Sequence, residues 1–229
     1  MVVWPPDIEP AAKIPLCRLR EIGDHRPDIG SFAPFMEPAL STVFFITHPD
    51  VVVDPGRPVP RWHLSDKGIA RMRIFAGTPD ARAVRSVWAS DETKAIEAAG
   101  ILAAAHGLPV GVHPGLHEND RSATGFLPPP EFEEVANRFF ERPEESVRGW
   151  ERAVDAQNRV RAAFDAIIAE KTAGDIAIVG HGGVGTLLLC HLTGVPISRD
   201  HDQPFQGHYW AYAPETATLL HPWRPIAPR

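Results

Sequence analysis

The sequence predicts an α/β fold built on a mostly parallel sheet. Short apolar runs rich in β-branched and aromatic residues alternate with stretches whose apolar residues recur at helical spacing. Two of these runs, residues 42–47 and 175–180, stop directly before a histidine, His48 and His181. No internal repeat or linker divides residues 41–229. Because strand–helix alternation buries a sheet between helices on both faces, residues 41–229 are predicted to form a single domain.

Residues 1–40 differ from the rest of the chain. They carry seven prolines and show neither helical nor strand periodicity. This composition favours an extended arm. We expect the arm to pack on the domain or on a partner subunit, as in a homo-oligomer.

The first strand, residues 42–47, is the stretch around which the other elements are arranged. It reads Thr-Val-Phe-Phe-Ile-Thr and is followed by His48 and Pro49. An apolar run bounded by breakers is typical of a buried parallel strand. Because proline prevents further pairing, His48 is predicted at the carboxyl edge of the sheet, where open α/β sheets bind ligands.

The next elements follow from local signals. Ser65 is predicted to cap a helix over residues 66–76, which has an aspartate in its first turn. Apolar content predicts a second strand at residues 84–89. Residues 91–106 are predicted to form a helix that buries Ile96 on an apolar stripe.

The remaining elements complete the alternation. In chain order they are a strand at residues 110–113, helices at about 131–141 and 146–171, a strand at 175–180, a helix that begins at Gly183, and a closing hairpin of residues 209–212 and 218–220.

Composition excludes several kinds of partner. A formal net charge of −6 argues against nucleic acid or an anionic membrane surface, because a polyanion would be repelled. No apolar run approaches the ~18 residues of a membrane span. The absence of signal-peptide features and the presence of only two cysteines predict a cytoplasmic protein. A small phosphorylated substrate is compatible with this charge because it responds only to the local field.

Residues 180–185 match the pattern G-x-G-x-x-G between a strand and a helix. A dinucleotide site would need an acidic residue about 20 positions further on, after another strand. Asp200 and Asp202 instead lie in a polar stretch, so this alternative is disfavoured. Thr186 stands where a P-loop requires lysine, and no serine has the G-x-S-x-G context of a nucleophile elbow.

His113, His117 and Glu118 raise the alternative of a metal site. Pro114 and Gly115 break the helix that would align the two histidines. A plain loop is therefore favoured, and neither a metal nor another cofactor is predicted.

Two strand-end histidines, the second before a glycine-rich helix start, favour phosphoryl transfer. Exposed N–H groups at a helix start attract an anion, and a neutral imidazole nitrogen can attack phosphorus. The transferred group also needs cations around it and an acid for the leaving oxygen. The residues available are His48 as nucleophile, His181 and the amides near Gly182 as oxyanion donors, Lys94, Arg57 and Arg61 as cations, and Glu118 as acid. Histidines that only satisfy backbone groups at a sheet edge would give the same pattern.

Five short motifs occur in order between residues 42 and 213. They are Thr-His-Pro at 47–49, Leu-Ser-x-x-Gly at 64–68, Ser-x-x-x-Lys-Ala at 90–95, Leu-x-Glu at 116–118 and Gly-His-Gly-Gly at 180–183. The ordered set resembles the histidine phosphatase superfamily, the phosphoglycerate mutase-like proteins, in which the first motif is Arg-His-Gly.

The resemblance implies a three-layer α/β/α sandwich and a set of roles. His48 would be the phosphohistidine nucleophile, Glu118 the proton donor and His181 the second pocket histidine. Lys94 stands where most members have a phosphate-binding arginine. Arg57 or Arg61 lies where a further substrate-contacting arginine is usual.

Thr47 takes the place of the family's phosphate-gripping arginine and is therefore a candidate phosphate-binding residue, but it departs most from the family pattern. Threonine cannot form the planar fork with which arginine grips a phosphoryl group. Loss of one such donor typically costs ~10²–10³ in rate. Pro49 and Lys94 are further departures, and Arg57, Arg61 or Arg121 could refill the pocket.

The expected function is that of a phosphomonoesterase, a hydrolase that acts through a phosphohistidine on a small phosphorylated substrate. The alternative, motivated by the departures at positions 47, 49 and 94, is a catalytically weakened protein that binds a phosphorylated ligand or a partner. A mutase is disfavoured because residues 114–130 show no second anion site.

Overall fold

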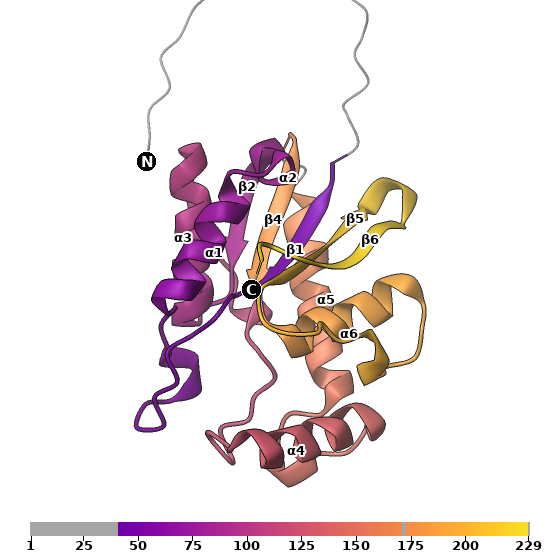
Figure 1. Ribbon diagram of the computed structural model, residues 1–229. Coiled ribbons are helices and arrows are strands. Elements are labelled where there is room, and N and C mark those ends of the chain that lie inside the picture. Colours follow the sequence, from indigo (N-terminus) through magenta and orange to yellow (C-terminus); the bar gives the residue numbers. More distant parts are fainter. Residues whose placement is uncertain (1–40, 171–172, 229) are drawn as a thin grey trace, which may run out of the picture. The chain divides into compact units, whose positions relative to one another are not determined.

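The structure is a computed structural model that describes residues 41–170 and 173–228 (Figure 1). One six-stranded sheet, in the order β3-β2-β4-β1-β5-β6, lies between two layers of helices. The predicted α/β class with a mostly parallel sheet is confirmed. The predicted arm, residues 1–40, lies outside the described residues.

The sheet has a parallel part and an antiparallel part. The strands are β1 (Val43–Thr47), β2 (Val84–Ala89), β3 (Val110–Val112), β4 (Asp175–Gly180), β5 (His208–Ala213) and β6 (Thr218–Pro225). The first four run parallel to one another, whereas β5 pairs antiparallel with β1 and β6 pairs antiparallel with β5. The predicted closing hairpin is therefore confirmed, and it extends the sheet beside β1.

Alternating side chains of β1 fill the two cores. Phe44 and Ile46 pack with the layer that contains α1 (Asp66–Ala76) and α3 (Thr93–His106). Val43 and Phe45 pack on the other face, as part of the core that α5 (Ala153–Ala169) and α6 (Gly182–Thr193) cover. All five residues of β1 are buried, as expected for the centre of a sheet with both faces covered.

The register of β1 and β4 brings two distant segments together. Thr47 lies opposite Gly180 in the parallel ladder, and the His48 N–H donates to the Gly180 carbonyl over 3.0 Å. Both strands end at the same edge of the sheet, so the residues that follow them, His48 and His181, are neighbours.

The helix α1 begins and ends where the sequence predicts. Ser65 caps it, and its side chain accepts a hydrogen bond from the Gly68 N–H over 3.2 Å. The predicted burial of Ile96 on α3 is wrong, because 39% of this residue is exposed. Five small or medium residues of α3 fill the buried face instead, namely Ala95, Ala98, Ala99, Leu102 and Ala103.

The predicted long helix over residues 146–171 is wrong at its start. Arg148 and Gly149 have φ angles of +54° and +81°, which an α-helix does not accommodate. They form a 3₁₀ turn at Val147–Gly149, and α5 begins at Ala153. This turn redirects the chain after α4 (Pro129–Glu141), which lies beyond the carboxyl edge of the sheet (Figure 1).

The other helical segments are short. They are α2 (Pro79–Ala83) and the 3₁₀ turns Val59–Arg61, Pro114–Leu116, Arg199–His201 and Pro214–Thr216. In the part of the chain that the structure describes, no helix is long and apolar enough to cross a membrane.

Candidate active site

The two strand-end histidines lie side by side. The ring centroids of His48 and His181 are 5.2 Å apart, and the ring planes meet at 65°. His48 is 8% exposed and His181 is fully buried. Of the two, only His48 therefore retains exposed surface.

A backbone carbonyl fixes the tautomer of His48. The Nδ1 atom lies 3.0 Å from the Pro49 carbonyl oxygen, which can only accept, so Nδ1 carries the proton. Burial, together with the nearby His181 and Lys94, lowers the pKa of His48 to about 3. The ring is thus neutral near pH 7, and its Nε2 has an available lone pair.

His181 is bonded on one side only. Its Nε2 lies 2.7 Å from the Ser90 hydroxyl, at the end of β2. Its Nδ1 is buried and has no hydrogen-bond partner among the described residues. Burial lowers the pKa of His181 to about 3, outweighing the opposite effect of the Glu92 carboxylate.

Glu92 is a site residue that the sequence analysis missed. It is 5% exposed and forms an ion pair with Lys94, and its Oε1 lies 3.6 Å from His181 Nε2. Burial would raise the pKa of Glu92, but neighbouring positive charge outweighs it and holds the pKa well below the usual range. Because His181 is itself neutral near pH 7, Lys94 is the cation that matters there.

Lys94, the predicted phosphate cation, is already engaged. Its Nζ donates to the Glu92 carboxylate and to the Val59 carbonyl, the latter over 3.0 Å. An ammonium group has three N–H donors, so one remains for another acceptor.

Glu118 caps the helix that follows β4. Its Oε2 accepts the Gly183 N–H over 3.2 Å, and its Oε1 accepts the Val184 and Asn119 N–H groups over 3.1 Å each. Two of the amides expected to hold an oxyanion near Gly182 are therefore occupied by a carboxylate. The Gly182 N–H itself has no partner among the described residues.

Thr47 is buried in a network that leads away from the histidines. Its hydroxyl accepts the N–H groups of Gly207 and His208 over 3.1 and 3.0 Å, and donates to Gln203 Oε1 over 2.6 Å. A hydroxyl has one hydrogen and two lone pairs. The side chain of Thr47 thus has no bonding capacity left for a phosphate oxygen.

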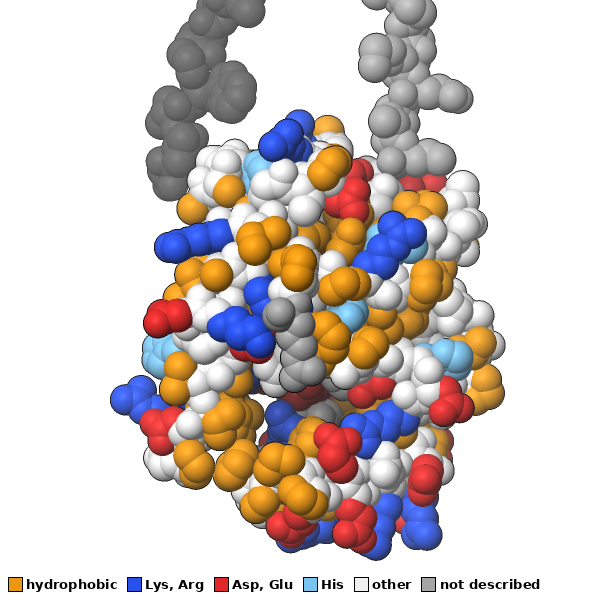
Figure 2. Space-filling view, viewed as in Figure 1, with side chains coloured by type: hydrophobic (Ala, Val, Ile, Leu, Met, Phe, Trp, Pro, Cys, Tyr) orange, Lys and Arg blue, Asp and Glu red, His pale blue; other side chains and the backbone are white. Residues whose placement is uncertain are grey.

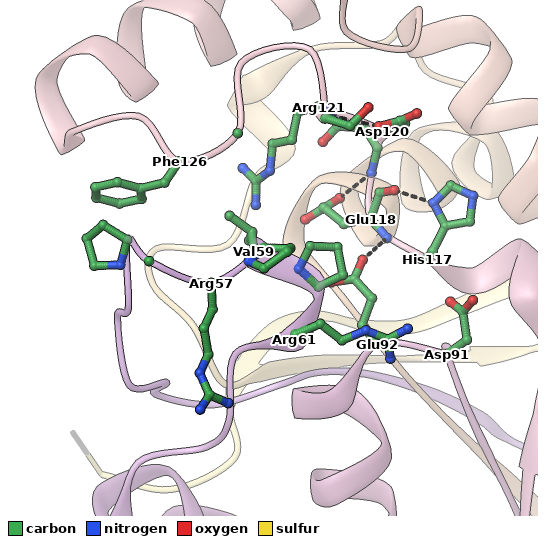
Figure 3. Close-up of a pocket in the computed structure, with 17 residues that line it drawn as sticks. Arg57, Val59, Arg61, Asp91, Glu92, His117, Glu118, Asp120, Arg121 and Phe126 are labelled. Carbon is green, nitrogen blue, oxygen red and sulfur yellow. Dashed lines mark hydrogen bonds between the residues drawn. The ribbon is translucent and has the colours of Figure 1, made fainter.

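A cavity of about 670 Å³ opens beside the site. Arg57 and Arg61 line it from one loop and Arg121 from another, and Figure 3 shows Arg121 extending between Phe126 and Glu118. Carboxylates also line it, namely Asp91, Glu92, Glu118 and Asp120. In Figure 2, side chains of both charges meet around a hollow above the lowest part of the view.

Arg57 and Arg121 differ in their partners. Arg57 forms an exposed ion pair with Asp54 over 3.2 Å. Arg121 lies over the rings of Phe132 and Trp150, with its guanidinium carbon 5.0 and 5.9 Å from their centroids. Arg121 is therefore held more firmly than Arg57.

The histidines His113 and His117 serve the loop before Glu118. Nδ1 of His113 accepts the Gly115 N–H over 3.1 Å, and Nδ1 of His117 lies 2.6 Å from the Glu118 carbonyl oxygen. Within residues 41–170 and 173–228, no three His, Cys, Asp or Glu side chains are placed to hold a metal ion.

Comparison with known proteins identifies one family. The model of the histidine phosphatase superfamily (branch 1) matches residues 59–209. This range includes Lys94, Glu118 and His181 but not His48, which follows the atypical Thr47. No curated protein matches the sequence.

Several solved structures are similar to this chain. The mycobacterial glucosyl-3-phosphoglycerate phosphatase is 18% identical over 80% of this chain and 96% of its own, with a TM-score of 0.65. YhfR of Bacillus stearothermophilus is 19% identical over 80% of this chain and 95% of its own, with a TM-score of 0.67. The putative alpha-ribazole-5'-P phosphatase of Escherichia coli is 20% identical over 82% of this chain and 98% of its own, with a TM-score of 0.64. At these identities the similarity concerns the fold.

Proposed function

The chain belongs to the histidine phosphatase superfamily, and from this premise we propose that it hydrolyses a small phosphate monoester through a phosphohistidine on His48. One observation carries the proposal above the others. A neutral imidazole whose Nδ1–H is held by the Pro49 carbonyl presents its Nε2 lone pair beside His181.

In the first step, Nε2 of His48 attacks phosphorus. The N–P bond forms as the ester P–O bond breaks, and the leaving oxygen takes a proton from Glu118. The imidazole becomes positively charged, and the Pro49 carbonyl that accepts Nδ1–H stabilises this charge. In the second step, water gives a proton back to Glu118 and attacks phosphorus, the N–P bond breaks, and phosphate leaves.

Four carboxyl groups line the cavity. Of the two glutamates among them, we assign the acid to Glu118 rather than Glu92. Lys94 keeps Glu92 ionised, so it has no proton to give. In Glu118, Oε1 accepts two N–H groups, whereas Oε2 accepts one and retains a lone pair for a proton.

Charge around the phosphoryl group comes from Lys94 and from the arginines of the cavity. Glu92 offsets the charge of Lys94. To bind the phosphoryl group, the ammonium group either donates its remaining N–H to a phosphoryl oxygen or exchanges its present partners for phosphoryl oxygens. The leaving group would occupy the cavity of about 670 Å³, a volume typical of small-molecule sites. Arg121 and Phe126 favour a leaving group with both polar and apolar parts.

The second candidate is a protein of the same fold that binds a phosphorylated ligand without turnover. The Glu92–Lys94 ion pair supports it, because this carboxylate competes with a phosphate for the only buried lysine among the described residues.

Hydrolysis of para-nitrophenyl phosphate, with and without chelator, tests the proposal. We expect chelator-insensitive turnover by the wild type and none by His48→Ala. Rapid quenching with radiolabelled substrate should trap a label that is acid-labile and base-stable. Turnover that survives His48→Ala would overturn the proposal, and phosphate binding without turnover would favour the second candidate.

A further inference from the structure

Gln203 lies in the segment between α6 and β5 and touches both strand-end motifs. Its side-chain Oε1 accepts the Thr47 hydroxyl over 2.6 Å. Nε2 of Gln203 is the nearest atom to the position that a Cβ atom of Gly182 would occupy. Thr47 precedes His48 and Gly182 follows His181, so the carboxamide of Gln203 connects the two positions beside the histidines.

The hydrogen bonds of Thr47 fix which way this carboxamide faces. Both lone pairs of the hydroxyl are filled by the N–H groups of Gly207 and His208. The hydroxyl must therefore donate its hydrogen. Of the two acceptors within reach, the carboxamide oxygen of Gln203 at 2.6 Å is much closer than the His208 carbonyl oxygen at 3.3 Å, so the oxygen of the carboxamide faces Thr47. The amino group is thereby directed to the other side, toward the start of α6.

Glycine at position 182 permits this placement. A Cβ atom there would collide with Nε2 of Gln203. The absent side chain thus leaves room for the amino group against the first residue of α6. A larger residue at position 182 would displace it.

Polar atoms without partners gather at this point. Nε2 of Gln203 has no acceptor among the described residues. The same holds for the N–H of Gly182, and Nδ1 of the fully buried His181, one residue earlier, has no partner within the described range either.

We propose that Gln203 is a phosphoryl-binding residue: its amino group, together with the Gly182 N–H, donates to the oxygens of the group that His48 attacks. This inference rests on the proposed function. It explains how the site compensates for Thr47, because Thr47 positions a carboxamide donor in place of the guanidinium that it cannot supply. A neutral donor adds hydrogen bonds but no charge.

Gln203→Glu and Gln203→Leu test the proposal, with Gln206→Leu as the matched control. Glutamate keeps an acceptor for Thr47 and replaces the donor with a second oxygen. Gln206 is exposed, and only its backbone carbonyl takes part in a described contact, with Arg71. The measurements are the Kd of inorganic phosphate and of vanadate by calorimetry, kcat/KM for para-nitrophenyl phosphate, and the Tm without ligand.

We expect Gln203→Glu to keep the wild-type Tm at pH 7, to bind phosphate at least ~10-fold more weakly and to lose ~100-fold in kcat/KM. Gln203→Leu should lose binding and also some stability, whereas Gln206→Leu should match the wild type. Unchanged phosphate affinity in Gln203→Glu would overturn the inference and leave the proposed function standing. Equal losses in Gln206→Leu would also overturn it. If the wild type neither bound phosphate nor hydrolysed the ester, both the inference and the proposed function would be overturned.

Discussion

Two helices, α3 and α6, begin at the carboxyl edge of the sheet, and a glutamate lies at the start of each. The two glutamates make different contacts. At α6, Glu118 comes from a loop 65 positions away and accepts the second and third amides of the helix. At α3, Glu92 is the N-cap residue, but its carboxylate makes no bond to the amides of its own helix. It pairs with Lys94 instead.

The difference separates two uses of a carboxylate near the proposed phosphoryl site. Glu118 is held by neutral N–H groups, and its Oε2 retains one lone pair at the place that the proposed mechanism gives to the proton donor. Glu92 accepts one neutral N–H, that of Glu118 over 2.9 Å, but it also pairs with the Lys94 cation, which keeps it ionised. The α6 side of the site is thus suited to proton transfer, whereas the α3 side carries a cation that is already neutralised.

The largest effect is expected at the α6 side, from Glu118→Gln. The variant keeps an oxygen for the amides but has no exchangeable proton, so kcat for para-nitrophenyl phosphate should fall ~10²–10⁴-fold. A substrate with a much better leaving group should recover part of the loss, because its oxygen needs no proton. If kcat stayed at the wild-type level for an alkyl phosphate, Glu118 would be only a helix cap.

Glu92→Gln changes the α3 side. Removal of one partner of a buried ion pair leaves Lys94 uncompensated, which typically costs ~3–5 kcal/mol of stability. The released ammonium group should at the same time bind phosphate at least ~10-fold more tightly. A gain of roughly 1.4 kcal/mol in the attraction between Lys94 and phosphate is enough for this factor. Urea unfolding with and without phosphate measures both, and addition of phosphate should restore most of the loss.

Weaker phosphate binding by Glu92→Gln than by the wild type would contradict the competition between this carboxylate and the ligand. Lys67 and Asp50, an ion pair with a half-exposed lysine, provide the control. Lys67→Met should change stability by about 0–1 kcal/mol and leave phosphate binding unaltered.

The pH dependence of stability separates the histidines from Glu92. The pKa values of His48 and His181 are lowered to about 3, so the folded state binds fewer protons than the unfolded chain below pH 6.5. Stability should fall as pH drops, by up to ~1.4 kcal/mol per pH unit for each histidine. Glu92, whose pKa is also lowered, should add to the loss only below pH 4.5.

Urea unfolding at pH 7, 6 and 5 tests this assignment. His181→Asn should flatten the slope between pH 6.5 and 4.5, whereas Glu92→Gln should leave the slope in that window unchanged. An equal slope in wild type and His181→Asn would mean that this histidine is not kept neutral by the fold.

The smallest effect concerns the cavity wall. Arg57→Ala breaks only an exposed ion pair with Asp54 and should change stability by less than ~0.5 kcal/mol. Arg121→Ala should cost more, about 1 kcal/mol, because its guanidinium lies over two aromatic rings. Thermal unfolding of both variants measures the difference, and a larger loss from Arg57→Ala would reverse this order.

The sequence was informative where a signal was local. A proline after β1 and glycines after β4 mark strand ends, and parallel pairing then brings His48 and His181 to one edge. Ser65 predicts the start of α1 for the same reason, since a cap acts on its own first turn. These features need no knowledge of distant contacts.

Features that depend on distant contacts were not predictable. Gln203, which accepts the Thr47 hydroxyl, is 156 positions away, and nothing in the sequence near either residue signals this hydrogen bond. Glu92 resembles any acidic helix start until Lys94 and His181 are seen beside it. The break before α5 was missed because Arg148, an ordinary helix former, adopts φ of +54° here.

The bonds of Thr47 also constrain how this protein can be redesigned. A single Thr47→Arg exchange would place a long charged side chain where a saturated hydroxyl ties β1 to residues 203–208, so it should unfold the edge rather than restore a cation. Positions 47, 182 and 203 form one interdependent set. Selection for a faster variant should accept changes at these three positions together and reject each of them alone.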